Sequence, residues 1–515
     1  MARFKQMPMD PSQVMLFGLS VDEALPKDSD VRAFYDVMNC LDYSEIESKC
    51  SSTGAPPYPP KVMVIILAYA YSKRMRSSRV IENALNVDVR FIWLAGGLKP
   101  DHNTIARFRK ENWQELKVLF KDSARICTEA GLVFLNAVAT DGSKIRAAAS
   151  KKQIYSHSRV DREMASVEKI LREAEKVDLA EDKEYASGNS NELPERLKDA
   201  KERKARLEEI AARLKDSNRK AVVASEADSR VMLTGDGKRA AYNLQASVDA
   251  ENQVIVAMDL TQAEDDHGQL PDMTDEVKEN MGLCPDASLV DCGYSDEQTL
   301  KWAKDTGHNV LMPLQEQPQE SKRKDLFASK CFLADDERDV LICPAGRELA
   351  FKLEHQLSNG TYRRYVAKGC RSCSFHGQCV SGRGSRRIEV NILASERKQM
   401  REKLKSPEGR KLYNLRRETV EPVFGQMKWN MGFDRFLLKG INGASAEAAL
   451  ICLVHNVMKC VTNADARAYL TRAKASLAAT YLALVLERYI LCRLAQTILC
   501  ASQRVKNMGK GCETT

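Results

Sequence analysis

Two apolar runs that lie far apart in the sequence each stop at an aspartate, and this arrangement constrains the fold more than any other feature. The run in FLNAVATDGSKIR stops at Asp141, and the run in ASLVDCGYSDEQ stops at Asp291. Between them, YNLQASVDA and VIVAMDLTQA flank residues 251–253 and predict an antiparallel hairpin. A helix around residues 267–281, a capped helix beginning at Ser295, a strand in HNVLMPL and a long last helix complete a βββαβαβα order. This order predicts an α/β fold with a mixed sheet.

In a mixed sheet of this order the first and fourth strands can lie side by side. Asp141 and Asp291 would then converge where open α/β sheets place their ligands. Glu421, in RRETVEPVFGQMK on the long helix, could complete the cluster. Three carboxylates held close together either take up protons or recruit a divalent cation. Oxygen ligands suit Mg²⁺ or Mn²⁺, and two such ions about 4 Å apart would support phosphodiester cleavage and strand transfer.

Each of these acids also has an ordinary explanation when it is taken alone. An aspartate after a strand usually forms a turn or caps a helix. Glu421 alone would suit a solvated helix face or an ion pair. The hypothesis of a catalytic site therefore depends on the three acids in combination.

Two segments interrupt the sheet pattern and are interpreted as insertions. Residues 155–225 are rich in Glu, Lys, Arg, Ala and Leu and contain the polar YASGNSNELP, which predicts a helical hairpin with a loop at its tip. Residues 315–395 form a basic, cysteine-bearing insertion. The catalytic unit would span residues 130–460. It would include a helical run over 394–431 with a break at Pro407 and then another apolar helix in GASAEAALICLVHNVMKC. An Ala/Leu-rich helical tail would follow at 464–515.

Before the sheet, residues 1–125 are interpreted as a helical N-terminal domain. VMVIILAYAYSKRM, SSRVIENAL and PDHNTIARFRKENWQELKVLF have helical patterns. We expect their N-caps at these positions: Ser77 or Ser78, and Asp101 or Asn103. Short helices, polar turns and arginines that include Arg74 are compatible with a helix-turn-helix that binds DNA. An ordinary small helical domain fits the same residues.

The charge balance and the apolar runs limit the partners and the location of the protein. The chain has 79 Lys and Arg against 71 Asp and Glu, a formal net charge of +8, which fits a polyanionic partner without requiring one. The longest uncharged apolar runs, 62–72 and 475–486, are shorter than the roughly 20 residues of a membrane helix, so we expect a soluble cytoplasmic protein. No GxxxxGK phosphate loop and no nucleophile elbow occurs in the sequence.

Fifteen cysteines, an odd number without an export signal before them, argue against a disulfide framework. Four of them lie in CPAGRELAFK and GCRSCSFHGQC: Cys343, Cys370, Cys373 and Cys379. These thiolates could hold a structural Zn²⁺, with His376 as a spare ligand. Four free cysteines in a reducing compartment are the alternative.

At this point the sequence resembles the DDE transposases of bacterial insertion sequences, whose catalytic core is RNase H-like and related to retroviral integrases. The resemblance runs from about Tyr58 to Lys459. It rests on these motifs in this order: YPPKVMVIILAYAY, PDHNTIARFR, TDGSKI, YNLQASVDA, LVDCGY, RRETVEPVFGQMKW and FLLKG.

The resemblance implies that Asp141, Asp291 and Glu421 are the metal-binding catalytic triad. It also implies that Arg417 and Lys428 belong to a tyrosine-arginine-glutamate-lysine signature, on one helix face with the glutamate, where they would contact phosphates. The tyrosine of that signature would stand at position 414, which is Asn414, next to Tyr413. We add three further cations as expected DNA contacts: Lys144, Arg74 and Arg109.

Three hypotheses from different classes follow. The first is a transposase that binds the terminal inverted repeats of its element, cuts there and joins the freed 3′ hydroxyls to target DNA, as a dimer or higher oligomer on double-stranded DNA. The second is a catalytically inactive or domesticated DNA-binding relative. The third is a nuclease on the same core without end specificity.

Overall fold

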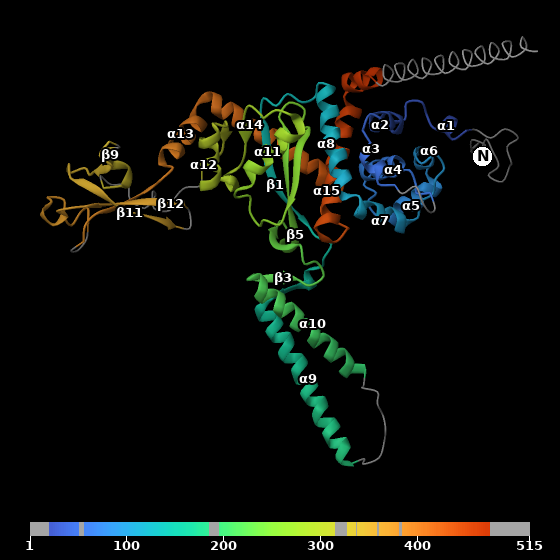
Figure 1. Cartoon of the computed structure of the whole chain (residues 1–515), viewed down its shortest axis with the longest axis horizontal. Helices are drawn as coiled ribbons and strands as arrows, with labels where there is room; N and C mark the ends of the chain where they lie inside the picture. The colour runs from blue at the N-terminus through green and yellow to red at the C-terminus, as the bar shows by residue number, and fades with distance from the viewer. Residues whose placement is uncertain are drawn as a thin grey trace, which may run out of the picture.

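The computed structural model describes residues 20–50, 56–184, 195–314, 327–335, 337–357, 360–380 and 384–473 (Figure 1). A central sheet lies at the middle of the molecule, helices cover it, and two extensions leave it in different directions. The loop at the tip of the helical hairpin and the expected helical tail beyond residue 473 lie outside the described residues.

The central sheet has six strands, and its order confirms the predicted neighbours. β1 (Val138–Arg146) is antiparallel to β5 (Gly237–Asp249) and parallel to β7 (Ser288–Leu289), which is parallel to β8 (Val310–Leu311). β6 (Ile255–Thr261) forms the predicted hairpin with β5. β4 (Arg230–Thr234), which was not predicted, pairs with the other end of β5. The strand that contains Asp141 and the strand that leads to Asp291 are therefore adjacent.

Asp141 lies inside β1, and the expectation that the strand stops there was wrong. The strand continues to Arg146 because the residues after Asp141 alternate in burial, with Ser143 and Ile145 buried and Lys144 half-buried between them. This alternation is hard to see in the sequence because Ser143 is polar. Asp141 is thus held by β5, where it pairs with Ala246.

Helices pack on both sides of this sheet. α11 (Gln269–Met281) and α12 (Glu297–Thr306) follow β6 and β7, and the N-cap of α12 is Asp296, one residue after the expected Ser295. α13 (Ala394–Lys405) and α14 (Pro407–Gly425) meet at Ser406, which confirms the predicted break. A π-helical turn, Gln426–Asn430, extends α14 and ends before Gly432, whose φ is +66°.

Among the described residues, the N-terminal helices include the three predicted helical runs and four further helices that were not predicted. In order, they are α1 (Val21–Ala24), α2 (Asp30–Met38), α3 (Ser44–Ser48), α4 (Pro60–Ser72), α5 (Ser78–Val87), α6 (Val89–Leu94), α7 (His102–Glu111) and α8 (Trp113–Glu129). Ser77 is the N-cap of α5, and the Asp101 side chain caps α7 by accepting from Thr104 N. The last predicted run divides into α7 and α8 at Asn112.

α15 (Gly440–Thr462) joins the N-terminal helices to the sheet. It lies beside α8 and also contacts α4 and β6 (Figure 1). By length and hydropathy α15 would suit a membrane span, but 89% of its apolar window is buried, as expected for a core helix. One hydrophobic cluster runs from Leu25 to Leu470 across these elements, so the N-terminal helices share the core of the sheet.

Charged side chains are also buried where α15 meets the N-terminal helices. Glu447 accepts from Arg76 Nη2 at 3.1 Å and lies 3.6 Å from Arg109 Nη1. Arg109 is 2% exposed and also donates to the Tyr71 hydroxyl and the Arg76 carbonyl. The interface is therefore built around an internal ion cluster.

The first extension is the predicted helical hairpin. α9 (His157–Glu184) and α10 (Glu195–Ser217) leave the body through a short ribbon of β2 (Ile154–Ser156) and β3 (Ala221–Val223), which pair antiparallel. Figure 1 shows both helices projecting away from the sheet. Small apolar clusters between α9 and α10 hold the hairpin together.

The second extension is the cysteine-bearing insertion, which forms a five-stranded antiparallel sheet. Its strands are β9 (Leu333–Asp335), β10 (Val340–Ile342), β11 (Glu348–Leu357), β12 (Gly360–Ala367) and β13 (Arg387–Asn391), paired in sequence order. It has a separate apolar cluster that includes Phe332, Leu349 and Tyr365. The insertion is therefore a small subdomain.

Candidate active site

The three predicted acids converge on one guanidinium group. Arg416 Nη2 lies 2.9 Å from Asp141 Oδ2 and 3.8 Å from Asp291 Oδ2, and Arg416 Nη1 lies 3.6 Å from Glu421 Oε1. Arg416 is 7% exposed, and its Nε atom has no hydrogen-bond partner. The structure thus brings together carboxylates from three separate elements.

Each acid is positioned by a different kind of local structure. Asp141 is fixed in the middle of a strand, and its Oδ1 accepts from Gly142 N at 2.9 Å. Asp291 follows β7 and caps a short 3₁₀ turn, Cys292–Tyr294, by accepting from Gly293 N at 2.7 Å. Glu421 projects from α14 one residue before Pro422. The two aspartates are therefore held by backbone bonds, whereas Glu421 is held only through its helix.

Burial dominates the electrostatics of Asp141. Burial raises the pKa of Asp141 to about 6, the Asp291 charge adds to the increase, and Arg416 opposes it. The Asp266 charge also raises the pKa of Asp141, which places Asp266 close to the site. A carboxylate so surrounded by like charges favours a bound proton or a cation near neutral pH.

Asp266 belongs to a hydrogen-bond network that the sequence analysis missed. Its Oδ1 accepts from Asn243 Nδ2 at 2.8 Å and from Gln245 Nε2 at 2.6 Å. The Tyr294 hydroxyl in turn donates to Gln245 Oε1. The sequence did contain a signal for this network, because the strand YNLQASVDA carries Asn243 and Gln245. Polar side chains in a buried strand need hydrogen-bond partners, which predicts a polar group nearby.

The residues expected to form the tyrosine-arginine-glutamate-lysine signature do not all lie at the acid site. Lys428 is half-buried in the π-helical turn, and although burial lowers its pKa, the Asp141 charge acts to raise it, so the two groups lie close together. Arg417 is exposed, and the guanidinium among the acids belongs to its neighbour Arg416. Tyr413 is also near the site, because the charges of Arg416 and Asp291 both affect its pKa, which burial raises. Asn414 is exposed.

The other expected DNA contacts differ in accessibility. Arg74 is exposed, and its Nη2 donates to the Trp429 carbonyl at 2.6 Å, beside Lys428. Lys144 is half-buried on β1, two residues after Gly142 and on the same face of the strand. Arg109 is buried in the ion cluster with Glu447, so the structure contradicts its selection as a DNA contact.

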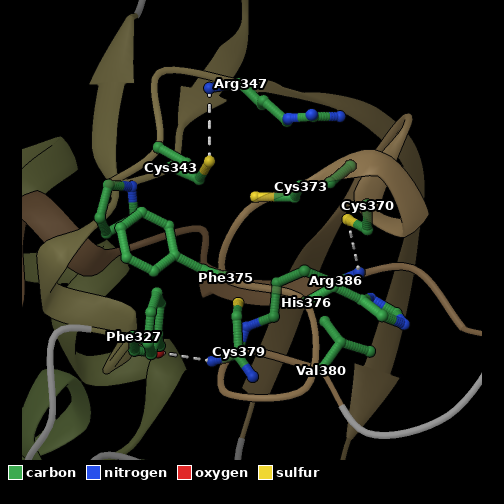
Figure 2. Close-up of a pocket in the computed structure, with 13 residues that line it drawn as sticks. Phe327, Cys343, Arg347, Cys370, Cys373, Phe375, His376, Cys379, Val380 and Arg386 are labelled. Atoms are coloured by element: carbon green, nitrogen blue, oxygen red, sulfur yellow. Dashed lines mark hydrogen bonds between the residues drawn. The ribbon is translucent and has the colours of Figure 1, made fainter.

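Four of the five cysteines of the insertion, Cys343, Cys370, Cys373 and Cys379, line one cavity of about 30 Å³ together with His376 (Figure 2). Backbone N–H groups donate to two of the sulfur atoms, from Arg347 to Cys343 at 3.3 Å and from Arg386 to Cys370 at 3.4 Å. Figure 2 shows the Cys343 and Cys373 sulfur atoms turned toward each other. Spacing in the sequence thus correctly predicted that these cysteines gather in one place.

Among the described residues, no group of three His, Cys, Asp or Glu side chains is arranged to hold a metal ion as it stands. At the acids, Arg416 lies between the carboxylates. At the cysteines, the Cys370 sulfur is turned to the backbone of Arg386. Both sites have the donor atoms but would need side-chain rotation to bind a metal.

Comparison with protein families finds two segments of the chain that resemble transposase domains. Residues 342–461 match a family model described as Transposase DDE domain, and residues 19–111 match one described as Transposase domain (DUF772). The first match includes Glu421 and α15, and it begins in the insertion, after Asp141 and Asp291. No curated protein and no solved structure matches the chain. The two domains together define a transposase.

In these two segments the chain is similar to the DDE transposases of insertion sequences.

Proposed function

We propose that this transposase binds the terminal inverted repeats of its element, cuts the DNA there and joins the ends to target DNA at the site formed by Asp141, Asp291 and Glu421. The convergence of these three acids around one guanidinium carries the proposal. The strand order, with β1 between β5 and β7, supports an RNase H-like core. The protein would act on DNA in the cytoplasm as a dimer or higher oligomer.

The donor set fits Mg²⁺ or Mn²⁺, because the acids supply only oxygen atoms and one of them is buried with a raised pKa. When bound, two such ions would activate the attacking oxygen and stabilise the leaving 3′ oxygen. Arg416 neutralises the acids in its present position. Asp141, Asp291 and Glu421 would hold the ions, and Arg416 would have to move away from them.

Several cations near the acids would hold the DNA backbone. Lys428 lies near Asp141, and Arg74 is joined to the same π-helical turn through the Trp429 carbonyl. With Lys144 and the exposed Arg417, they would contact phosphates next to the cut. Phosphate contacts of this kind would weaken steeply with salt concentration.

The experiment that tests this proposal is cleavage of a plasmid carrying the ends of the element, with Mg²⁺ or with EDTA. We expect the wild type to cut at the ends only with Mg²⁺, and Asp291→Ala to bind the ends without cutting them. Asp305→Ala, which removes a carboxylate from the end of α12, is the matched control and should cut normally.

Each contrary outcome identifies another function. End binding without cleavage in the wild type would point to an inactive or domesticated DNA-binding relative. Metal-dependent cutting without preference for the ends would point to a nuclease. Cleavage that persists in Asp291→Ala would refute the acid site.

We also propose that the cysteine cavity holds a structural Zn²⁺. The support is that Cys343, Cys370, Cys373 and Cys379 line one small cavity and that backbone N–H groups already donate to two of the sulfur atoms. Metal analysis of the purified protein should find one zinc per chain, and Cys373→Ser should lose it. Cys284→Ser, at an exposed cysteine elsewhere, should keep it. A wild type without zinc would mean that the thiols are free.

A further inference from the structure

Asp266 lies between the backbone segments that follow the two aspartates of the site. A Cβ atom added at Gly142, next to Asp141, would lie 2.1 Å from Asp266 Oδ1. A Cβ atom added at Gly293, two residues after Asp291, would lie 3.4 Å from Asp266 Oδ2. Only the absence of a side chain at Gly142 allows the carboxylate to approach so closely.

The position of Asp266 is fixed from β5, the strand that pairs with β1. Asn243 and Gln245 both donate to its Oδ1, and they lie opposite Lys144 and Gly142 in the strand pairing. Both amides are 0% exposed. Because two donors hold one oxygen, the other oxygen remains turned toward the segment after Asp291.

A buried acceptor without a partner lies at the same place. Asn243 Oδ1 has no hydrogen-bond partner, and it is 2.9 Å from the position that a Cβ atom of residue 142 would take. A buried carbonyl oxygen without a donor is unfavourable and calls for a group to satisfy it. A hydrated cation held by the neighbouring carboxylates would supply such a donor.

Anchoring the loop does not explain the charge of Asp266. An asparagine at this position could accept the same two hydrogen bonds through its carbonyl oxygen. A carboxylate adds repulsion with Asp141 and Asp291, and such repulsion is offset when a cation binds. Compared with asparagine, an aspartate at the fixed, half-buried position 266 is therefore unfavourable for folding but favourable for cation binding.

We propose that Asp266 is a positioning residue of the acid site, which supplies a fourth negative charge for divalent cations and sets the separation of the segments after Asp141 and Asp291. This inference rests on the proposed function, because it assumes that the site binds divalent cations. The loop between β6 and α11 would then place Asp266 at the acids, and the two amides of β5 would hold it there.

The test compares Mn²⁺ binding by Asp266→Asn with that of the wild type, measured by electron paramagnetic resonance on the full chain. Removing one charge close to the ions should weaken Mn²⁺ binding by about tenfold or more. The thermal unfolding temperature in EDTA should stay the same or increase. Asp265→Asn, which changes the exposed neighbouring acid, is the matched control and should bind Mn²⁺ like the wild type.

Other outcomes separate this inference from the proposed function. Unchanged Mn²⁺ affinity with a lower unfolding temperature would show that Asp266 only anchors its loop. Asp266→Ser is measured in parallel, so that a folding defect in one variant does not decide the result. Asp141→Asn should lose Mn²⁺ binding, and if it binds normally, the acid site itself is refuted.

Discussion

At the scale of single residues, Asp141 carries the main electrostatic cost of the site. Its pKa is raised to about 6 from an ordinary value of 3.8, mainly by burial. The folded state therefore holds a proton on Asp141 that the unfolded state has released between these pH values. Stability from this group is highest at low pH and is lost as the pH rises from about 4 to about 6.

We therefore predict that Asp141→Asn is more stable than the wild type above pH 6 in EDTA, by up to about 3 kcal/mol. Well below pH 3.8 the difference should vanish, because the wild-type side chain is then neutral in both states. Urea unfolding at about pH 3 and pH 7.5 measures both values. A variant that is less stable than the wild type at pH 7.5 would contradict this electrostatic account.

The sequence predicted that Asp141, Asp291 and Glu421 would lie close together, but it did not predict the groups that surround them. Asp141 and Asp291 could be found because each interrupts an apolar run of the sequence. The resemblance to a transposase family supported the choice of Glu421. Arg416 and Arg417 are adjacent and identical, and only the packing of α14 decides which one is buried. Asp266 follows another aspartate in an ordinary polar loop, so its role depends on the distance between loops.

At the scale of elements, α15 shows how charge is buried inside this fold. Glu447 is 0% exposed and lies between Arg76 and Arg109 from the N-terminal helices. It also accepts from Leu437 N at 2.8 Å. Removal of its charge would leave two guanidinium groups buried without their counter-ion.

We predict that Glu447→Gln lowers the free energy of unfolding by about 3–5 kcal/mol, the usual cost of breaking a buried ion pair. Denaturant unfolding followed by circular dichroism measures this change. Glu279→Gln removes an exposed partner of Lys121 and should have a much smaller effect, because solvent screens that ion pair. Equal effects of the two variants would mean that the buried cluster does not hold α15 in place.

The hairpin of α9 and α10 is an element that the body should not need for folding. β2 and β3 already bring Ser156 and Ala221 together as partners. We predict that replacing residues 157–220 with a short glycine-containing turn changes the free energy of unfolding by no more than about 1 kcal/mol. Denaturant unfolding tests this, and loss of a cooperative transition would show that the hairpin belongs to the core.

Elements were easier to predict than their ends. Strand-like residue patterns predicted the hairpin of β5 and β6, the proline itself predicted the break at Pro407, and an apolar run predicted α15. The end of β1 was wrong because a buried serine looks like a loop residue in a sequence, and β4 was missed because its strand is short and partly exposed. The sheet of the insertion was not predicted because charged residues interrupt the apolar pattern of its longer strands, as Lys352 and Glu354 do in β11 and the adjacent Arg363 and Arg364 do in β12.

At the scale of the whole molecule, the N-terminal helices and the sheet share one hydrophobic core, so we expect them to unfold as one unit. α4 and α8 bury their apolar faces against α15, which comes from the other end of the described chain. We predict that a fragment of residues 20–130 does not unfold cooperatively alone, and that co-expression with residues 131–473 restores a folded complex. Circular dichroism during heating tests both forms, and a cooperative transition in the isolated fragment would contradict it.

The hairpin and the insertion differ from this unit because each has small apolar clusters of its own, separate from the main core. Length can therefore be gained or lost at these two points without repacking the main core. During evolution, such points would accept new segments, whereas an exchange of the N-terminal helices between related elements would require matching changes in α15. The history of this chain should therefore show variation at the two extensions and joint inheritance of its two ends.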